Sequence, residues 1–138
     1  MKLLIIEDDF NVAQHLAALS EACGHQVCAI TADADEAFCL ALREEPNLVI
    51  ADIDLAGGGD GIEAAVHIRE ALNVRTIFLT GSCDAATRDR AQHAWPLGFL
   101  AKPIDGPTFQ QKLAGVVSIL ESSFARDLLK PSPAAGVI

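Results

Sequence analysis

The amino-acid sequence predicts an α/β fold in which five strands of an open parallel sheet alternate with five helices, a (βα)5 arrangement. Short apolar runs of strand length alternate along the chain with longer stretches in which apolar residues recur at helical spacing. Most of these runs are continuously apolar, which is typical of parallel strands covered on both faces. Because crossovers between parallel strands are right-handed, helices are expected on both faces, and 138 residues suffice for one such domain.

Five apolar runs are predicted to be the strands: residues 3–6, 26–30, 48–51, 76–79 and 97–101. The first helix is expected where apolar residues repeat at helical spacing before Gly24, a typical helix stop: Val12, Leu16, Leu19 and Cys23. The second helix is bounded by a capping pattern, Asp33 with Glu36 three residues later, and by Pro46.

The third helix is indicated by four apolar residues: Ile62, Ala65, Val66 and Leu72. A weaker pattern over residues 84–94 predicts the fourth. The fifth should begin with Asp105 or Gly106 as its cap and Pro107 in its first turn. Its apolar residues are Phe109, Leu113, Val116, Val117 and Leu120. We expect the folded domain to span residues 1–122 and residues 123–138, with two prolines and little periodicity, to form a mobile tail without an output domain.

Charge and hydropathy exclude several classes of ligand and location. The net charge is −9 and the basic residues form no run, so nucleic acid is not expected as a direct ligand. Glu7 and the two acids after it interrupt the apolar N-terminus, and no segment approaches the roughly 20 apolar residues that span a bilayer. We therefore expect a soluble, cytoplasmic protein that does not bind membranes.

The four cysteines show no CxxC pair and no histidine at ligand spacing. They are interpreted as small buried hydrophobic residues, not as disulfides or metal ligands.

Polar residues follow four of the five predicted strands, in the order Glu7, Asp8 and Asp9, then Asp52 and Asp54, then Thr80, then Lys102 and Pro103. In an open parallel sheet these strand ends meet at one edge, where ligands bind. Several carboxylates close together repel one another, and a hard divalent cation such as Mg²⁺ relieves that repulsion. A lysine and a hydroxyl beside the cation suit an incoming phosphoryl group, and a carboxylate can accept that group as an acyl phosphate.

Over roughly residues 1–122 these residues resemble the receiver domains of two-component response regulators. The motifs are I-I-E-D-D, A-D-I-D-L followed by D-G-I-E, F-L-T-G, and F-L-A-K-P, in that order. The resemblance implies a flavodoxin-like, doubly wound three-layer fold with strand order 2-1-3-4-5. It also implies a single-domain response regulator that takes a phosphoryl group from a histidine kinase or a histidine phosphotransfer protein, and that signals to a downstream partner protein.

The resemblance further implies a role for each site residue. Asp52 would be the phosphoacceptor, Asp8 a direct Mg²⁺ ligand, Glu7 a holder of metal-bound water, and Asp54 a ligand through its backbone carbonyl. Thr80 would bond a phosphoryl oxygen, Lys102 would pair with it, and Lys102–Pro103 would be a cis peptide. Thr80 and Phe99 would be the switch residues. The altered surface would be the fourth helix, fifth strand and fifth helix, where a partner or a second copy would bind.

The chain departs from the family pattern in three places. Ala56 stands four residues after Asp52, where many receivers have proline. The switch aromatic is Phe99, which has no hydroxyl, and Trp95 lies in a stretch that replaces the commoner Gly-Ala. These departures make the partner surface the part of the resemblance with the least support. Trp95 and Phe99 are expected to belong to the core or to a partner surface.

Two alternatives remain. Asp52-Ile53-Asp54 is similar to the Asp-x-Asp of haloacid-dehalogenase-type phosphatases, although that motif normally lies on the first strand of a larger chain. The other alternative is a pseudo-receiver that binds partners without phosphorylation, although no acid, threonine or lysine of the family's site is missing. The favoured interpretation is a signalling domain and not an enzyme, with only self-catalysed phosphotransfer and dephosphorylation. Asp9 is expected to cap the first helix instead of binding metal.

Overall fold

The structure, a computed structural model, describes residues 1–55, 60–81 and 84–129, with side chains described as far as Ser123. Its elements along the chain are β1 (Lys2–Ile6), α1 (Phe10–Ala22), β2 (Gln26–Thr31), α2 (Ala34–Glu44), β3 (Leu48–Asp52), α3 (Gly61–Leu72), β4 (Thr76–Thr80), α4 (Ala85–Ala91), the 3-10 turn η1 (Gln92–Ala94), β5 (Gly98–Ala101) and α5 (Gly106–Leu129).

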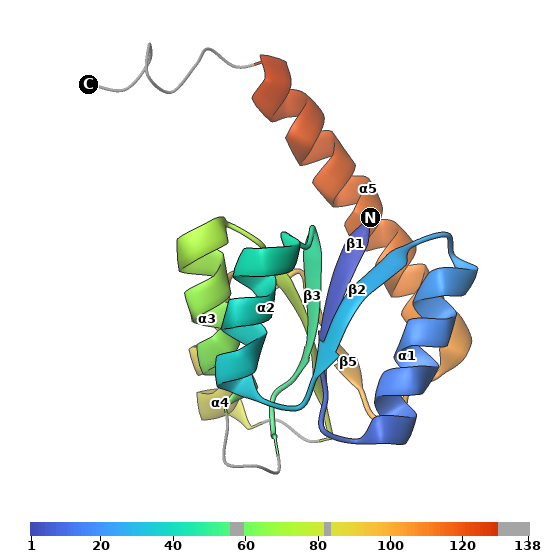
Figure 1. Ribbon diagram of the computed structural model, residues 1–138, viewed down its shortest axis with the longest axis vertical. Coiled ribbons are helices and arrows are strands. Elements are labelled where there is room, and N and C mark those ends of the chain that lie inside the picture. The colour runs from blue at the N-terminus through green and yellow to red at the C-terminus, as the bar shows by residue number, and fades with distance from the viewer. Residues whose placement is uncertain (56–59, 82–83, 130–138) are drawn as a thin grey trace.

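The five strands form one parallel sheet in the order β2-β1-β3-β4-β5 (Figure 1). Helices α2, α3 and α4 cover one face of this sheet, and α1 and α5 cover the other. The predicted three-layer fold and its strand order are thereby confirmed. The order reverses between β1 and β3, so the carboxyl ends of these two strands lie beside each other at one edge.

Each face of the sheet has its own hydrophobic core. Leu4, Ile6 and Phe78 point toward the helices on the α2 and α3 side. Ile5 and Phe109 belong to the core under α1 and α5. The largest of these side chains, Phe78 and Phe109, are fully buried, and each such burial contributes about 1.5–3 kcal/mol to folding. Alternate residues of β1 thus face the two different cores, which explains why the sequence of this strand is a continuous apolar run.

Local capping determines where the helices begin. Asp9 accepts hydrogen bonds from the backbone N–H groups of Asn11 and Val12, and Asp33 accepts one from Glu36. Both caps were predicted from the sequence and both are confirmed. An N-cap carboxylate satisfies amide groups that have no partner within the helix. The same hydrogen bonds orient the Asp9 side chain toward α1, away from the carboxylates at the sheet edge.

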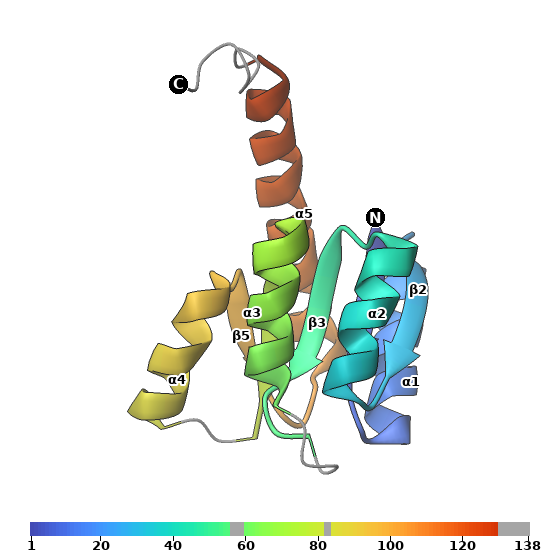
Figure 2. The same cartoon turned by 60° about the vertical axis from the view of Figure 1, so that its left-hand side comes forward.

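The element boundaries differ from the sequence-based expectations in several places. Strands β1 to β4 are each one residue longer than expected, β5 begins at Gly98 instead of residue 97, and the fourth helix gives way to the turn η1 after Ala91. The fifth helix continues to Leu129, beyond the boundary expected at residue 122 (Figure 2). No glycine or proline occurs between Gly115 and Pro131, so nothing in the local sequence stops the helix earlier. The rest of the expected tail, residues 130–138, lies outside the described residues.

The expectation that all the cysteines are buried is wrong. Cys23 and Cys39 are exposed and Cys28 is half-buried, all as free thiols, while Cys83 lies outside the described residues. Cys23 ends α1 and Cys39 lies on the outer side of α2. Residue type alone does not determine which face of a helix a small side chain occupies.

Candidate functional site

The carboxyl ends of four strands bring the predicted site residues to one edge of the sheet. Glu7 follows β1, Asp52 and Thr80 are the last residues of β3 and β4, and Lys102 follows β5. The register pairs Asp52 with Leu79, and the Lys102 N–H donates to the Thr80 carbonyl at 2.9 Å. The sheet therefore fixes the backbone from which these side chains project.

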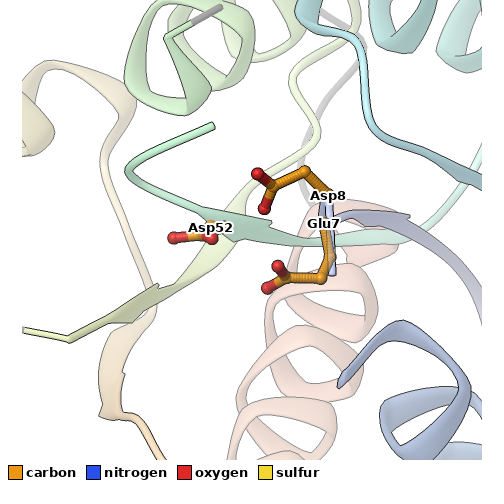
Figure 3. Close-up of side chains that lie close together, drawn as sticks. All are labelled: Glu7, Asp8 and Asp52. Atoms are coloured by element: carbon orange, nitrogen blue, oxygen red, sulfur yellow. The ribbon is translucent and has the colours of Figure 1, made fainter. Parts of the chain in front are cut away.

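Three carboxylates form a tight cluster at this edge. One oxygen from each of Glu7, Asp8 and Asp52 lies within 4.8 Å of the others (Figure 3). Glu7 and Asp52 are nearly inaccessible to solvent, with exposed fractions of 2% and 4%. Buried carboxylates at this spacing repel one another, so the cluster favours a bound cation.

Lys102 is the cation that the chain itself supplies. Its Nζ lies 2.8 Å from Asp52 Oδ2, in a hydrogen-bonded ion pair, and 2.9 Å from Glu7 Oε2. The peptide bond between Lys102 and Pro103 is cis. One ammonium group therefore bridges two of the three carboxylates, and the cluster keeps an excess of negative charge.

The ionisation of the cluster reflects these contacts. Burial raises the pKa of Glu7 above its ordinary value, and the negative charge of Asp52 adds to this, while the Asp9 N–H and Lys102 oppose it. Burial by itself lowers the pKa of Lys102, but its contacts with Asp52 and Glu7 outweigh that effect and raise the pKa. Lys102 is thus charged at neutral pH, and the Glu7 carboxylate is held in an environment that disfavours its charge.

Thr80 contributes a buried hydroxyl. Its side chain is 7% exposed, and its Oγ1 has no hydrogen-bond partner among the residues that the structure describes. A buried hydroxyl that makes no hydrogen bond costs about 1–3 kcal/mol. This unsatisfied group is therefore available to a polar ligand at the sheet edge.

Asp54 lies beside the carboxylate cluster, and Phe99 lies on β5 in contact with Phe78 and Arg88. The Asp54 N–H donates to Asp52 Oδ1 at 3.1 Å, which holds the start of the β3–α3 connection against the Asp52 carboxylate. The Asp54 side chain is exposed, and the role expected of its carbonyl stays a prediction. Phe99 pairs with Phe78 across β4 and β5, their ring centroids 5.8 Å apart, and the Arg88 guanidinium lies over its ring.

Two features of the site were missed by the sequence reasoning. The position that a Cβ would take on Gly61 is occupied by the backbone carbonyl of Asp52, so only glycine fits there. Asp60 caps α3 and forms an ion pair with Arg90 of α4. Asp60 and Gly61 begin the D-G-I-E motif, but the motif carries no information about the packing of α3 on β3 or about the ion pair with Arg90.

The fold and the residues at this edge match those expected of a receiver domain. The model of the response regulator receiver domain family matches residues 3–114, and the chain belongs to that family.

Two curated relatives are regulators. The chain is 30% identical over 128 residues to the phyllosphere-induced regulator PhyR of Methylorubrum extorquens, which covers 91% of this chain and 47% of PhyR. It is 30% identical over 102 residues to the transcriptional regulatory protein PdtaR of Mycobacterium tuberculosis, over 74% of this chain and 49% of PdtaR. The chain thus spans about half the length of the curated relatives it matches.

Solved structures of receiver domains and response regulators superpose on this chain. The signal receiver domain of a modulated diguanylate cyclase from Desulfovibrio desulfuricans superposes with a TM-score of 0.80 at 30% identity, covering 88% of this chain and 97% of that one. The response regulator PhyR from Brucella abortus gives a TM-score of 0.78 at 27% identity, over 91% and 51% of the two chains.

Within the described residues, no helix has the length and apolar character that a bilayer crossing requires.

Proposed function

We propose that this receiver domain accepts a phosphoryl group on Asp52 from the phosphohistidine of a histidine kinase or a histidine phosphotransfer protein. One oxygen of the Asp52 carboxylate attacks phosphorus and the P–N bond to the donor imidazole breaks. The imidazole already carries a proton on its other ring nitrogen, so it leaves as the neutral ring. The observation that carries the proposal is the environment of Asp52, a buried carboxylate joined to Lys102 and flanked by Glu7 and Asp8. Lys102 and Thr80 can offset the charge of the incoming phosphoryl oxygens, as transition-state stabilisation of phosphoryl transfer requires.

Mg²⁺ is the proposed cofactor, and the residues present fit it. Carboxylate oxygens that lie within 4.8 Å of one another are the ligand type and spacing that this ion accepts. Asp8 and Asp52 would be direct ligands, Glu7 would hold metal-bound water, and Asp54 would contribute its carbonyl. When bound, the ion supplies positive charge that offsets the carboxylates and the phosphoryl oxygens. The chain's own contribution is to fix the Asp52 carboxylate through its hydrogen bond with Lys102.

The response to phosphorylation is proposed to pass through Thr80 and Phe99. When the Thr80 hydroxyl turns to bond the phosphoryl group, it vacates space into which Phe99 can move. That movement would separate Phe99 from Arg88 of α4 and alter the surface of α4, β5 and α5, where a downstream protein or a second copy would bind. Full burial of an exposed phenylalanine contributes on the order of 1.5–3 kcal/mol, and Phe99 is already half-buried against Phe78, so its movement supplies less. A full population shift needs about 5.5 kcal/mol, so the Thr80 and Lys102 contacts must supply the rest.

A small phosphodonor tests the acceptor directly. Incubation with acetyl phosphate and Mg²⁺ should add one phosphoryl group that is labile to base and stable to acid, and Asp52→Ala should abolish it. Asp54→Asn is the matched control, because the proposed role of Asp54 uses only its backbone. A full adduct on Asp52→Ala would contradict the proposal. Rapid turnover of a phosphate ester that depends on the Asp54 side chain would instead support the phosphatase alternative.

The switch is tested separately by nuclear magnetic resonance with beryllofluoride, a phosphoryl mimic. Chemical-shift changes should extend from Asp52 to Phe99 and to α4 and α5. Changes limited to the immediate surroundings of Asp52 would contradict signalling through this surface.

A further inference from the structure

Trp95, Arg69 and Arg75 form a cationic and aromatic cluster that phosphoryl acceptance does not use. Arg69 lies near the end of α3, Arg75 directly precedes β4, and Trp95 follows η1 ahead of β5. These segments meet at the amino ends of the strands, the edge of the sheet opposite to Asp52. Figure 2 shows α3 and α4 side by side on the same face of the sheet. We call this cluster the Arg–Trp patch.

Trp95 is both exposed and held in an unfavourable backbone conformation. Its side chain is 57% exposed, and its φ of 51° and ψ of 59° lie in the left-handed region that bulky residues rarely adopt. Two hydrogen bonds maintain this conformation: the Trp95 N–H donates to the Gln92 carbonyl at 3.0 Å, and Arg75 Nε donates to the Trp95 carbonyl at 2.7 Å. Strained residues that the surrounding structure holds in place occur preferentially at binding and catalytic sites.

The two arginines present positive charge that no carboxylate of the described residues neutralises. The Arg69 guanidinium carbon lies 3.4 Å from the centroid of the Trp95 ring, and Arg69 Nε is buried without a hydrogen-bond acceptor among the described residues. Both arginines contact Trp95, Arg69 at the ring and Arg75 at the backbone carbonyl, so the two cations lie close together. Burial and the nearby charge of Arg69 lower the pKa of Arg75. No ion pair joins either arginine to an acid within residues 1–55, 60–81 and 84–123.

Charge complementarity identifies the kind of partner. Two adjacent guanidinium groups bind carboxylates through paired hydrogen bonds, and the exposed Trp95 ring offers an apolar surface beside them. Tryptophan and arginine are also the residues that most often dominate the energy of protein interfaces. The net charge of −9 disfavours a nucleic acid, which needs clustered positive charge, and the same charge opposes association of two copies.

We propose that the Arg–Trp patch is a docking site for a short acidic segment of a partner protein, with carboxylates on Arg69 and Arg75 and an apolar side chain on Trp95. The patch lies at the opposite edge from Asp52, so such a partner can stay bound while the kinase approaches the phosphorylation site. The proposal goes beyond phosphoryl acceptance and does not depend on it.

The test begins with selection from a random peptide library displayed on phage, using the unphosphorylated protein and the Asp52→Ala variant as baits. Enriched peptides should carry Asp or Glu beside an apolar residue, and both baits should select them. Trp95 is the only tryptophan and there is no tyrosine, so its fluorescence emission reports directly on the patch. A selected peptide, made synthetically, should shift this emission saturably, and added salt should weaken its binding.

Arginine variants decide whether the patch itself is responsible. Arg75→Gln and Arg69→Gln should each weaken peptide binding by about tenfold or more, and Arg75→Lys should lose less because it keeps the charge. Arg43→Gln is the matched control, an exposed arginine on α2 that pairs with Glu44 instead, and should leave the affinity unchanged. Thermal unfolding of each variant identifies any that fail to fold. Trp95→Phe removes the only tryptophan and with it the fluorescence signal, so peptide binding to this further variant is measured by calorimetry.

Several results would overturn the proposal. They are a failure to enrich any peptide, enriched peptides without acidic residues, and binding that Arg69→Gln and Arg75→Gln leave intact. Tighter binding of a single-stranded oligonucleotide would reassign the patch to nucleic acid. Self-association abolished by Arg69→Gln would reassign it to a contact between copies. None of these results depends on phosphorylation, so the role of Asp52 is tested independently.

Discussion

Replacing Lys102 by glutamine is expected to destabilise the protein in the absence of Mg²⁺, because Glu7 and Asp52 then lose the cation that lies between them. Removing one partner of a fully buried ion pair costs about 3–5 kcal/mol, and an exposed pair is worth less than about 1 kcal/mol. The Lys102 side chain is 24% exposed, while those of Glu7 and Asp52 are 0% and 6% exposed. The expected loss lies between these limits, at about 1–3 kcal/mol.

The dependence of this loss on pH follows from the raised pKa of Lys102. A group whose pKa is raised by folding stabilises the protein below its unfolded pKa, and that stabilisation disappears as the pH rises through the folded value. The difference between wild type and Lys102→Gln should therefore persist at neutral pH and shrink above the ordinary lysine pKa of 10.5. Added Mg²⁺ should restore part of the lost stability, because it relieves the same repulsion.

Urea unfolding with and without Mg²⁺ measures these effects. Lys112→Gln is the matched control, since the Lys112 side chain packs along Gly98, away from the carboxylate cluster. If Lys102→Gln is no less stable than Lys112→Gln when EDTA is present, the ion pairs of Lys102 do not stabilise the fold and the reasoning fails.

Three further predictions concern the same edge of the sheet. Asp8→Asn should weaken Mg²⁺ binding in a titration, and an unchanged affinity would mean that the metal site is misplaced. The pKa of Glu7 is raised by folding, so ionisation of Glu7 lowers the stability of the protein as the pH rises toward that raised value. At pH 7 without Mg²⁺, Glu7→Gln should therefore unfold at a higher urea concentration than wild type. This gain should vanish in urea titrations at pH values below the ordinary glutamate pKa of 4.5; a gain that persists there would have another cause. Gly61→Ala should lose about 1–3 kcal/mol of stability and slow phosphorylation, because its Cβ meets the Asp52 carbonyl. The control Gly115→Ala, with nothing within 4 Å, should be neutral or stabilising, and equal effects would refute the steric argument.

The sequence by itself determined the elements and the order in which the site residues appear. Continuous apolar runs indicate strands covered on both faces, helical spacing indicates the buried face of a helix, and caps such as Asp9 and Asp33 act on amides two or three residues away. These are local effects, so they can be read from neighbouring residues. The parallel arrangement then required the residues at the carboxyl ends of β1, β3, β4 and β5 to meet at one edge, and Glu7, Asp52, Thr80 and Lys102 do meet there.

Only the tertiary structure decided which side chains touch. The ion pairs of Lys102 with Glu7 and Asp52, the close approach of Gly61 to Asp52, and the stacking of Arg69 on Trp95 all join residues far apart in the chain. Such contacts depend on strand register and on how the helices pack against the sheet and against one another, which neighbouring residues in the chain do not determine. The burial expected of Cys23 and Cys39 was also wrong: residue type suggested the interior, but Cys23 lies at the C-terminal cap of α1 and Cys39 on the outer side of α2, and both are exposed.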